Sequence, residues 1–461
     1  MSTFKRLAEA PRLPALIIAQ LRFQALQCAS HRRLSMIGIA MNSRRKLSLL
    51  AAATALVLAS CAEPQGGSTA TSSAPEPTRA AAAPPPPAPA AAPAPPLAPA
   101  PFTEAIARAG EKLLADAQAV VGTGPRELII DPLIDGSTGQ QTASTVAEGQ
   151  QITALIKAKA PAWNVRPLTR ANLSNGPLLL VGTLTAVNTR NVATETADAF
   201  RACLVLVDLR SGKLIAKKVD RATAGSVNAE PTAFYRDTPT WTRDKTVSGY
   251  IKTCQGSVPG DAIDPNYLLR LPAAALLNEA TIAYTEGKLA DAYRLYHDAR
   301  GMAEPDDLRV LNGLYITSWR TGKKKEAADA FNQIVAVGLD AKRLPIKMFF
   351  NPGATTLLKN ADLQAQYALW MREVATQVGG RESCMKVVGH TSKTGSAAAN
   401  ETLSQRRAAV IKQSLERENR KLVTRLTSEG VGSRENLVGL GTDDLRDALD
   451  RRVEFRTVDC S

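Results

Sequence analysis

The sequence predicts a multidomain α+β protein. At 461 residues the chain is longer than one ordinary hydrophobic core requires, so two or three domains are expected. Residues 102–262 and 341–461 both mix helical and strand-like patterns, whereas residues 263–340 show helical periodicity alone. We therefore expect a small α/β domain, a central set of helical hairpins, and a C-terminal domain with a βαβαβ order.

The basic excess is concentrated at the N-terminus. The formal net charge is +14, but residues 1–60 hold nine Lys and Arg against a single acid, Glu9. The other 401 residues carry 48 basic and 42 acidic side chains, which is ordinary for their number. No basic stretch is interleaved with aromatic residues, so nucleic-acid binding is not expected.

Residues 41–60 have the pattern of a secretory signal peptide. The basic residues 44–46 precede twelve uncharged, mostly apolar residues at 47–58, a run shorter than the roughly 20 residues that cross a bilayer. The sequence at 58–61, Leu-Ala-Ser-Cys, resembles a bacterial lipobox. That resemblance implies an acylated Cys61 that anchors the chain in outer-membrane lipid, facing the periplasm. The alternative is a plain signal peptide followed by an incidental cysteine.

Two further segments flank this signal. Residues 1–40 precede Met41 and are interpreted as a mis-called extension of the reading frame. Residues 61–101 run from the candidate lipidated Cys61 into an Ala/Pro-rich stretch that cannot bury apolar area. We expect this stretch to be a semi-rigid linker that separates the folded domains from the lipid.

The cysteines also favour an exported protein. Apart from Cys28 and Cys61, two cysteines fall in each mixed domain, and the periplasm is oxidising. The predicted disulfides are Cys203–Cys254 and Cys384–Cys460. The alternative is a set of buried free thiols. There is no CxxC motif and the three histidines are isolated in the sequence, so neither a metal site nor a cofactor is predicted.

Residues 102–262 predict a small α/β domain. A helix comes first, then a strand over 127–135, a helix over 144–158, and strands over 163–168, 177–187, 202–209 and 214–220, with a tight turn at 210–213. Asp131 and Asp135 flank part of the first strand. They favour turn and strand-end positions over a catalytic carboxylate pair.

Residues 263–340 contain a near-repeat with an offset of 35 residues. Tyr284 corresponds to Trp319, and Gly287, Ala292 and Tyr296 correspond to equivalent residues in the second copy, namely Gly322, Ala327 and Phe331. This layout resembles tetratricopeptide helical hairpins. The resemblance leaves two roles open, a groove for a protein partner or a spacer.

Residues 341–461 contain the most informative motifs. A strand is expected over 346–350, a helix through 363–374, a strand over 384–388, a long helix capped by Ser396, and a final strand over 450–455. The motifs are Gly389-His390-Thr391, Gly395, Asn400, Leu403-Ser404, Arg407-Ala408, Gly430, Gly432 and Arg-Arg-Val-Glu-Phe at 451–455. In this order they resemble the OmpA-like C-terminal domain family.

The resemblance implies a peptidoglycan-binding site. The family's ligand positions correspond to Thr391, Ser392, Asn400, Leu403 and Arg407. The ligand would be diaminopimelate, whose carboxylate suits a helix N-terminus and the guanidinium of Arg407. The alternative role of Arg407 is a structural salt bridge. Arg451 and Arg452 are expected to support the fold.

One position departs from the family. Ser392 stands where the family has an aspartate, so the ligand's ammonium group loses a charged partner. Losing such a contact costs about 1.5–3 kcal/mol, or roughly 10- to 100-fold in affinity. Asp443 or Asp444 could substitute.

Three functions remain open from the sequence. The first is a non-enzymatic tether between outer membrane and peptidoglycan. The second is a scaffold for envelope assembly or secretion, in which the C-terminal domain binds peptidoglycan weakly or not at all. The third is a hydrolase within 102–262, against which stands the lack of any Ser/His/Asp, HExxH or paired-carboxylate motif.

Overall fold

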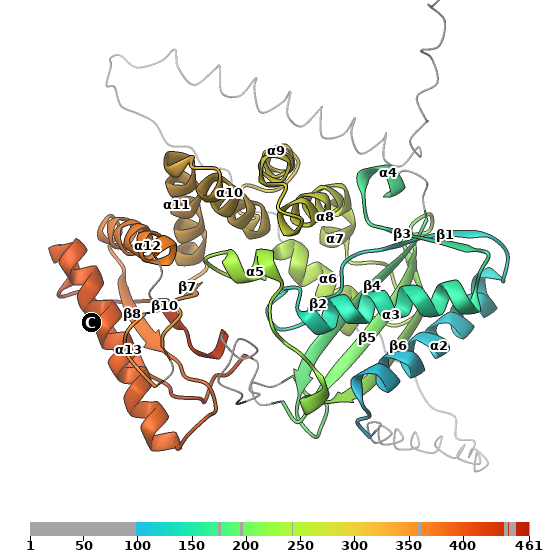
Figure 1. Cartoon of the computed structure of the whole chain (residues 1–461), viewed down its shortest axis with the longest axis horizontal. Coiled ribbons are helices and arrows are strands. Elements are labelled where there is room, and N and C mark those ends of the chain that lie inside the picture. The colour runs from blue at the N-terminus through green and yellow to red at the C-terminus, as the bar shows by residue number, and fades with distance from the viewer. Residues whose placement is uncertain are drawn as a thin grey trace, which may run out of the picture. The chain divides into compact units, whose positions relative to one another are not determined.

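The computed structural model describes residues 98–173, 177–193, 197–241, 243–351, 353–357, 361–437, 441 and 449–460 (Figure 1). The predicted extension, signal peptide, Cys61 and most of the linker lie outside these residues, as do Asp443 and Asp444. Among the described helices, none is long and apolar enough to cross a membrane.

A six-stranded mixed sheet organises the first part of the described chain. Its strands are β1 (Arg126–Ile130), β2 (Ile134–Asp135), β3 (Trp163–Pro167), β4 (Leu178–Val187), β5 (Ala199–Asp208) and β6 (Lys213–Thr223). Their order is β3-β1-β4-β5-β6, with β2 also paired to β4. The β1, β2, β3 and β4 pairings are parallel, whereas β5 runs antiparallel to both β4 and β6.

Helices cover both faces of this sheet (Figure 1). They are α2 (Phe102–Val121) and α3 (Ala143–Lys159) on one face, and α6 (Lys245–Gln255), α7 (Pro265–Leu269) and α8 (Leu271–Thr285) on the other. Along β4, Leu180 packs under α2 and α3, while Leu179 and Val181 pack under α6 to α8. All ten residues of β4 are therefore buried, which explains the continuous apolar run in its sequence.

The structure corrects two details of the predicted α/β domain. The expected strand over 127–135 is interrupted after β1, because Pro132 has no N–H to donate to a sheet. The expected linker ends before residue 101, since Ala100 exchanges backbone hydrogen bonds of 2.9 and 2.8 Å with Arg221 and Thr223. Short helices α4 (Arg170–Leu173) and α5 (Ala233–Asp237), like α6, were not predicted.

Asp131 and Asp135 make separate structural contacts. The Asp135 carboxylate accepts hydrogen bonds from the backbone N–H groups of Ser137 and Thr138 at 3.0 and 2.7 Å. This is the turn role predicted for it. Asp131 is buried and accepts a hydrogen bond from the Tyr267 hydroxyl.

Two helical pairs follow the sheet. They are formed by α8 with α9 (Leu289–Arg300), and by α10 (Leu308–Arg320) with α11 (Lys324–Asp340). Gly287 and Gly322 occupy the same place after α8 and α10, with φ values of 75° and 79° that favour glycine. Ala292 on α9 and Ala327 on α11, the second helix of each pair, are both fully buried. The near-repeat in the sequence thus corresponds to equivalent structural positions.

A four-stranded sheet forms the C-terminal part. Its order is β7 (Arg343–Ile346), β10 (Val453–Val458), β8 (Cys384–Gly389) and β9 (Leu426–Gly430), with β8 and β9 parallel and the other pairs antiparallel. The helices α12 (Ala361–Gly379) and α13 (Ala397–Glu418) pack with Val453 and Phe455 in one core cluster. Strand β9 adds one strand to the expected βαβαβ order.

The first strand of this sheet lies earlier than predicted. We expected it over 346–350, but β7 ends at Ile346. At Lys347 the chain turns to the α/β part: its N–H donates to the Pro239 carbonyl at 2.8 Å, and its buried ammonium donates to Tyr235 and Thr238. These contacts compete with continued pairing to β10.

Both predicted disulfides are present. Cys203 on β5 is bonded to Cys254 on α6, and Cys384 at the start of β8 is bonded to Cys460. Each bridge therefore lies within one of the two mixed α and β parts.

Candidate functional site

Two glycines bring α13 directly against the ends of β8 and β9. A Cβ atom added at Gly389 would lie 2.1 Å from the backbone oxygen of Ser404. At Gly430 it would lie 2.3 Å from the backbone nitrogen of Gln405. Only glycine permits this approach, which places the loop after β8 beside the first turns of α13.

That loop is tied to α13 by hydrogen bonds. Ser396 caps the helix, its hydroxyl accepting from the Ala399 N–H at 3.2 Å, as predicted. The Asn400 side chain donates to the Thr394 carbonyl at 3.0 Å. The Thr391 N–H donates to the Gly432 carbonyl at 2.9 Å. Asn400 is thus occupied in holding the loop's shape.

Arg407 lies at the base of the same loop, almost completely buried. Its guanidinium donates to the carbonyl oxygens of Ala354 at 3.0 Å, Asn351 at 3.2 Å and His390 at 3.5 Å. Its Cζ atom also lies 4.8 Å from the centre of the Phe350 ring. Arg407 therefore joins the loop after β8 to the loop after β7.

The other predicted ligand positions differ in burial. Thr391 and Ser392 are buried, whereas Leu403 is half-buried on α13. The Thr391 hydroxyl has no hydrogen-bond partner within the described part of the chain. The structure thus places Thr391, Ser392, Asn400 and Arg407 at one loop, whereas no contact of the described residues places Leu403 there. The sequence did not predict that Asn351 and Ala354 join this site.

Comparison with known families assigns this region. Residues 349–448 match the model of the OmpA family.

The C-terminal domain is an OmpA family domain.

Solved structures similar to this OmpA domain come from several bacteria. An outer-membrane protein of Borrelia burgdorferi is 22% identical, with 25% of this chain and 88% of that chain covered and a TM-score of 0.20. The peptidoglycan-associated lipoprotein of Burkholderia pseudomallei is 20% identical, with 24% and 88% covered and a TM-score of 0.21. The cell wall anchor of the T6SS from Pseudomonas aeruginosa is 19% identical, with 28% and 97% covered and a TM-score of 0.21. No curated protein matches the chain significantly.

A network of charged side chains lies on the face of the OmpA domain's sheet opposite α12 and α13, together with Glu435 from the loop after β9. We call the following residues the charged face: Arg343, Glu435, Arg452, Glu454 and Arg456. Glu454 is completely buried and accepts from Arg343 through two bonds of 2.9 Å and from Arg452 at 2.8 Å. Glu435 forms an ion pair with Arg456. Arg452 thus supports the fold, as predicted.

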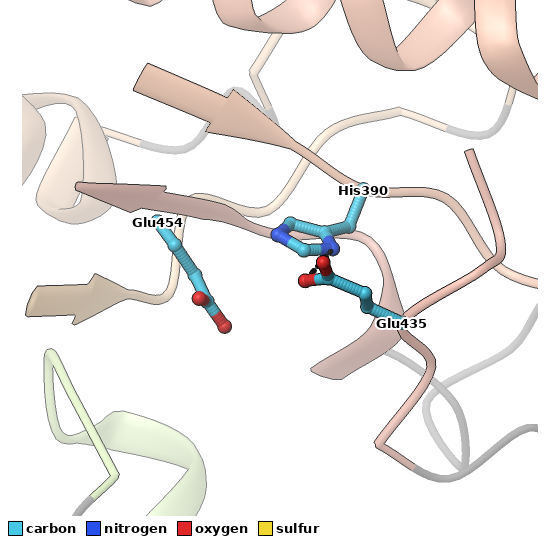
Figure 2. Close-up of side chains that lie close together, drawn as sticks. All are labelled: His390, Glu435 and Glu454. Carbon is cyan, nitrogen blue, oxygen red and sulfur yellow. Dashed lines mark ion pairs between the residues drawn. The ribbon is translucent and has the colours of Figure 1, made fainter. Parts of the chain in front are cut away.

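His390 lies inside this network (Figure 2). Its ring is completely buried, neither nitrogen has a hydrogen-bond partner in the described structure, and Nδ1 lies 4.0 Å from a Glu435 oxygen. Burial, together with the charge of Arg452, lowers the pKa of His390 to about 2. The ring is therefore neutral at physiological pH. The neighbouring guanidinium groups lower the pKa of Glu454, against the effect of its burial.

The three residues of Figure 2 have the donor types of a metal site but not its surroundings. Ligand atoms of His390, Glu435 and Glu454 lie within 4.8 Å of one another. However, both carboxylates already accept hydrogen bonds from the guanidinium groups of the charged face. A divalent ion would have to displace these bonds beside three positive charges. The cluster is better explained as an ion-pair network that supports the loop after β8.

Proposed function

We propose that this protein is a non-enzymatic outer-membrane lipoprotein that binds peptidoglycan through its OmpA domain. The match of residues 349–448 to the OmpA family carries this proposal. The loop around Thr391 and Ser392, with Arg407 beneath it, supports it because this is where the family resemblance implies a diaminopimelate ligand. The role would be a tether that supports envelope integrity.

Arg407 can contribute to binding in two ways. It can exchange one of its carbonyl partners for the ligand's carboxylate, or it can hold the loop after β8 in the shape that binds the ligand. A ligand carboxylate is a stronger acceptor for a guanidinium than a backbone carbonyl, so exchange for one of the carbonyl contacts is favourable. Ser392 supplies no charge for the ligand's ammonium group. We therefore expect a site of lower affinity than one with an aspartate at this position.

Co-sedimentation of the full chain with insoluble peptidoglycan tests the proposal. The variants are Arg407→Ala and Ser392→Asp, with Arg406→Ala as the matched control, since Arg406 is the neighbouring exposed arginine of α13. The wild type and Arg406→Ala should sediment, Arg407→Ala should lose about tenfold or more in affinity, and Ser392→Asp should gain. Circular dichroism verifies that Arg407→Ala remains folded.

A different outcome would favour the second candidate function. If only Ser392→Asp sediments and the wild type stays in solution, the tether fails. The OmpA domain would then be part of a protein-interaction scaffold for envelope assembly or secretion. The buried Arg407 guanidinium donates to three backbone carbonyls that hold the loop together, and this structural use of the side chain favours the scaffold.

Anchoring through Cys61 is a separate part of the proposal. The lipobox-like sequence at 58–61 supports it. Metabolic labelling with a radioactive fatty acid should label the wild type, whereas Cys61→Ser should remain unlabelled and leave the membrane fraction. Labelling of the variant would argue against this anchor.

A protein partner on the helical pairs is also proposed. The equivalence of Gly287 with Gly322 and of Ala292 with Ala327 supports a tetratricopeptide-like arrangement. The proposed domains are residues 102–262, 263–340 and 341–461, the first of them extended at its start to Ala100. Cross-linking in the intact envelope, from a photoreactive residue at the exposed Met302, tests whether a protein lies against these helices.

A further inference from the structure

A hollow opens beside the charged face, with Arg343 of that face among its lining residues. Its volume is about 480 Å³, and it is bounded by β7, by α11 and by residues of the α/β part. Trp241, Arg243, Leu344 and Asn436 are among its lining residues. This volume lies within the range of sites for small organic molecules, roughly 300–1,000 Å³.

The charged lining of the hollow is basic. Within the described part of the chain its charged lining residues are Arg243 and Arg343, and no acid lines it. Arg343 is compensated by its paired bonds to Glu454. Arg243 is exposed and makes no hydrogen bond or ion pair with the described residues, although its charge acts on Asp135. One guanidinium is therefore available to a ligand.

Arg452 lies next to Trp241, with its guanidinium carbon 5.8 Å from the centre of the Trp241 ring. Its terminal nitrogens have no hydrogen-bond partners among the described residues, but its Nε donates to Glu454 at 2.8 Å, so its charge is paired. The Asn436 side chain donates to the Thr391 carbonyl at 2.8 Å, and its buried oxygen, an acceptor, has no partner in the described part of the chain. Arg243 is therefore the lining cation that a ligand can pair with.

The remaining lining selects for an apolar group. Trp241, Leu344, Ile334 and Leu437 present apolar surface to the same hollow as Arg243. Among the described lining residues Arg243 is the guanidinium without a partner, and it balances one negative charge, which a carboxylate supplies. A phosphate dianion brings a second charge that this side chain does not balance.

We propose that this hollow binds an organic carboxylate with an apolar substituent, such as the C-terminal end of a short peptide. The carboxylate pairs with Arg243, and the substituent packs against Trp241 and Leu344. Asn436 joins this hollow to the loop around Ser392 through its bond to Thr391, but Arg243 and Trp241 lie outside that loop, so the proposal does not depend on peptidoglycan binding.

Calorimetric titration of the full chain tests this proposal. The probe is N-acetyl-L-leucine, compared with its neutral amide and with inorganic phosphate. The carboxylate should bind at least about tenfold more tightly than the amide, because a charge-assisted pair is lost in the amide. Arg243→Gln should remove this difference. Arg210→Gln, at an exposed arginine in the β5–β6 turn, is the matched control and should preserve it.

Tryptophan fluorescence locates the bound probe. The carboxylate should change the emission of the wild type, and Trp241→Phe should abolish that change. Three outcomes overturn the proposal: equal affinity for carboxylate and amide, a fluorescence change that persists in Trp241→Phe, or phosphate binding as tight as that of the carboxylate.

Discussion

Gly389 sets how closely α13 approaches the sheet. The structure leaves no space for a side chain there, because a Cβ would lie 2.1 Å from a backbone oxygen that is fixed within the helix. The same approach positions Thr391 and Ser392 beside the helix. Single residues of this kind determine the geometry of the site without contacting a ligand.

The substitution Gly389→Ala should therefore displace α13. We expect a loss of at least about 2 kcal/mol in the free energy of unfolding, because the clash is with backbone and not with a flexible side chain. Urea denaturation measures it. Gly380→Ala is the control, since its nearest contact would be at 3.6 Å, and it should change stability by less than about 0.5 kcal/mol. Equal effects of the two substitutions would contradict this account.

Glu148 makes the stability of the α/β part depend on pH. Its carboxyl group is fully buried on α3, neither oxygen has a partner among the described residues, and burial raises its pKa to about 8. The unfolded value is near 4.5. Between these pH values the folded state binds more protons than the unfolded state, so this group's contribution to stability falls as pH rises.

Glu148→Gln should remove that dependence. The variant should match the wild type near pH 5 and exceed it by roughly 2 kcal/mol or more at pH 8.5, where the wild-type carboxylate is charged. Thermal unfolding at both pH values measures the difference. Glu111→Gln, at an exposed position of α2, should leave the pH profile unchanged. If the stability of Glu148→Gln and of wild type changed with pH in parallel, other groups would be stabilising the charged Glu148 carboxylate.

At the scale of elements, the Cys203–Cys254 disulfide joins β5 to the helix that covers it. The two cysteines are 51 residues apart in sequence, so the bridge closes a long loop of the unfolded chain. Both cysteines belong to the core cluster between the sheet and α6. The bridge therefore stabilises the attachment of this face to the sheet.

Replacing both cysteines with serine should cost about 2–4 kcal/mol in unfolding free energy. The loss should appear first as faster hydrogen exchange in α6 and less in α2, which packs on the opposite face. Reduction of wild type should reproduce the effect. An unchanged urea midpoint in the double variant would show that packing alone holds α6.

At the scale of the whole molecule, one core cluster crosses the predicted boundary at 340. It runs from Phe234 through the helical pairs to Phe455 on β10. At its centre Trp370 on α12 stacks on Phe331 of α11, with ring centroids 5.7 Å apart, and its indole N–H donates to the Tyr315 hydroxyl at 2.7 Å. The helical pairs and the OmpA domain therefore stabilise each other.

Trp370→Ala should weaken both parts together. Removing a buried tryptophan costs about 3–5 kcal/mol, and the cavity borders α11 as well as α12. Hydrogen exchange should accelerate in α10 and α11 to the same extent as in α12 and α13. Protection that falls only in the OmpA domain would show that the shared core does not couple the two parts.

Local patterns predicted much of the secondary structure and the family. The alternation in Arg-Arg-Val-Glu-Phe is an example: Val453 and Phe455 enter the core while Arg452 and Glu454 face the charged side. The cap at Ser396 and the disulfide pairing also follow from local residue types and compartment. Such features depend on neighbours in the sequence or on a small number of cysteines.

The sequence by itself determined the element types, the near-repeat and the motifs of the OmpA domain, because these rest on periodicity and on fixed spacings. Only the tertiary structure decided that β7 ends at Ile346, that Arg407 donates to the carbonyls of Asn351 and Ala354, and that Arg243 and Leu344 line one hollow. These contacts join segments between about 50 and 110 residues apart. Their partners are set by packing, which no local pattern records.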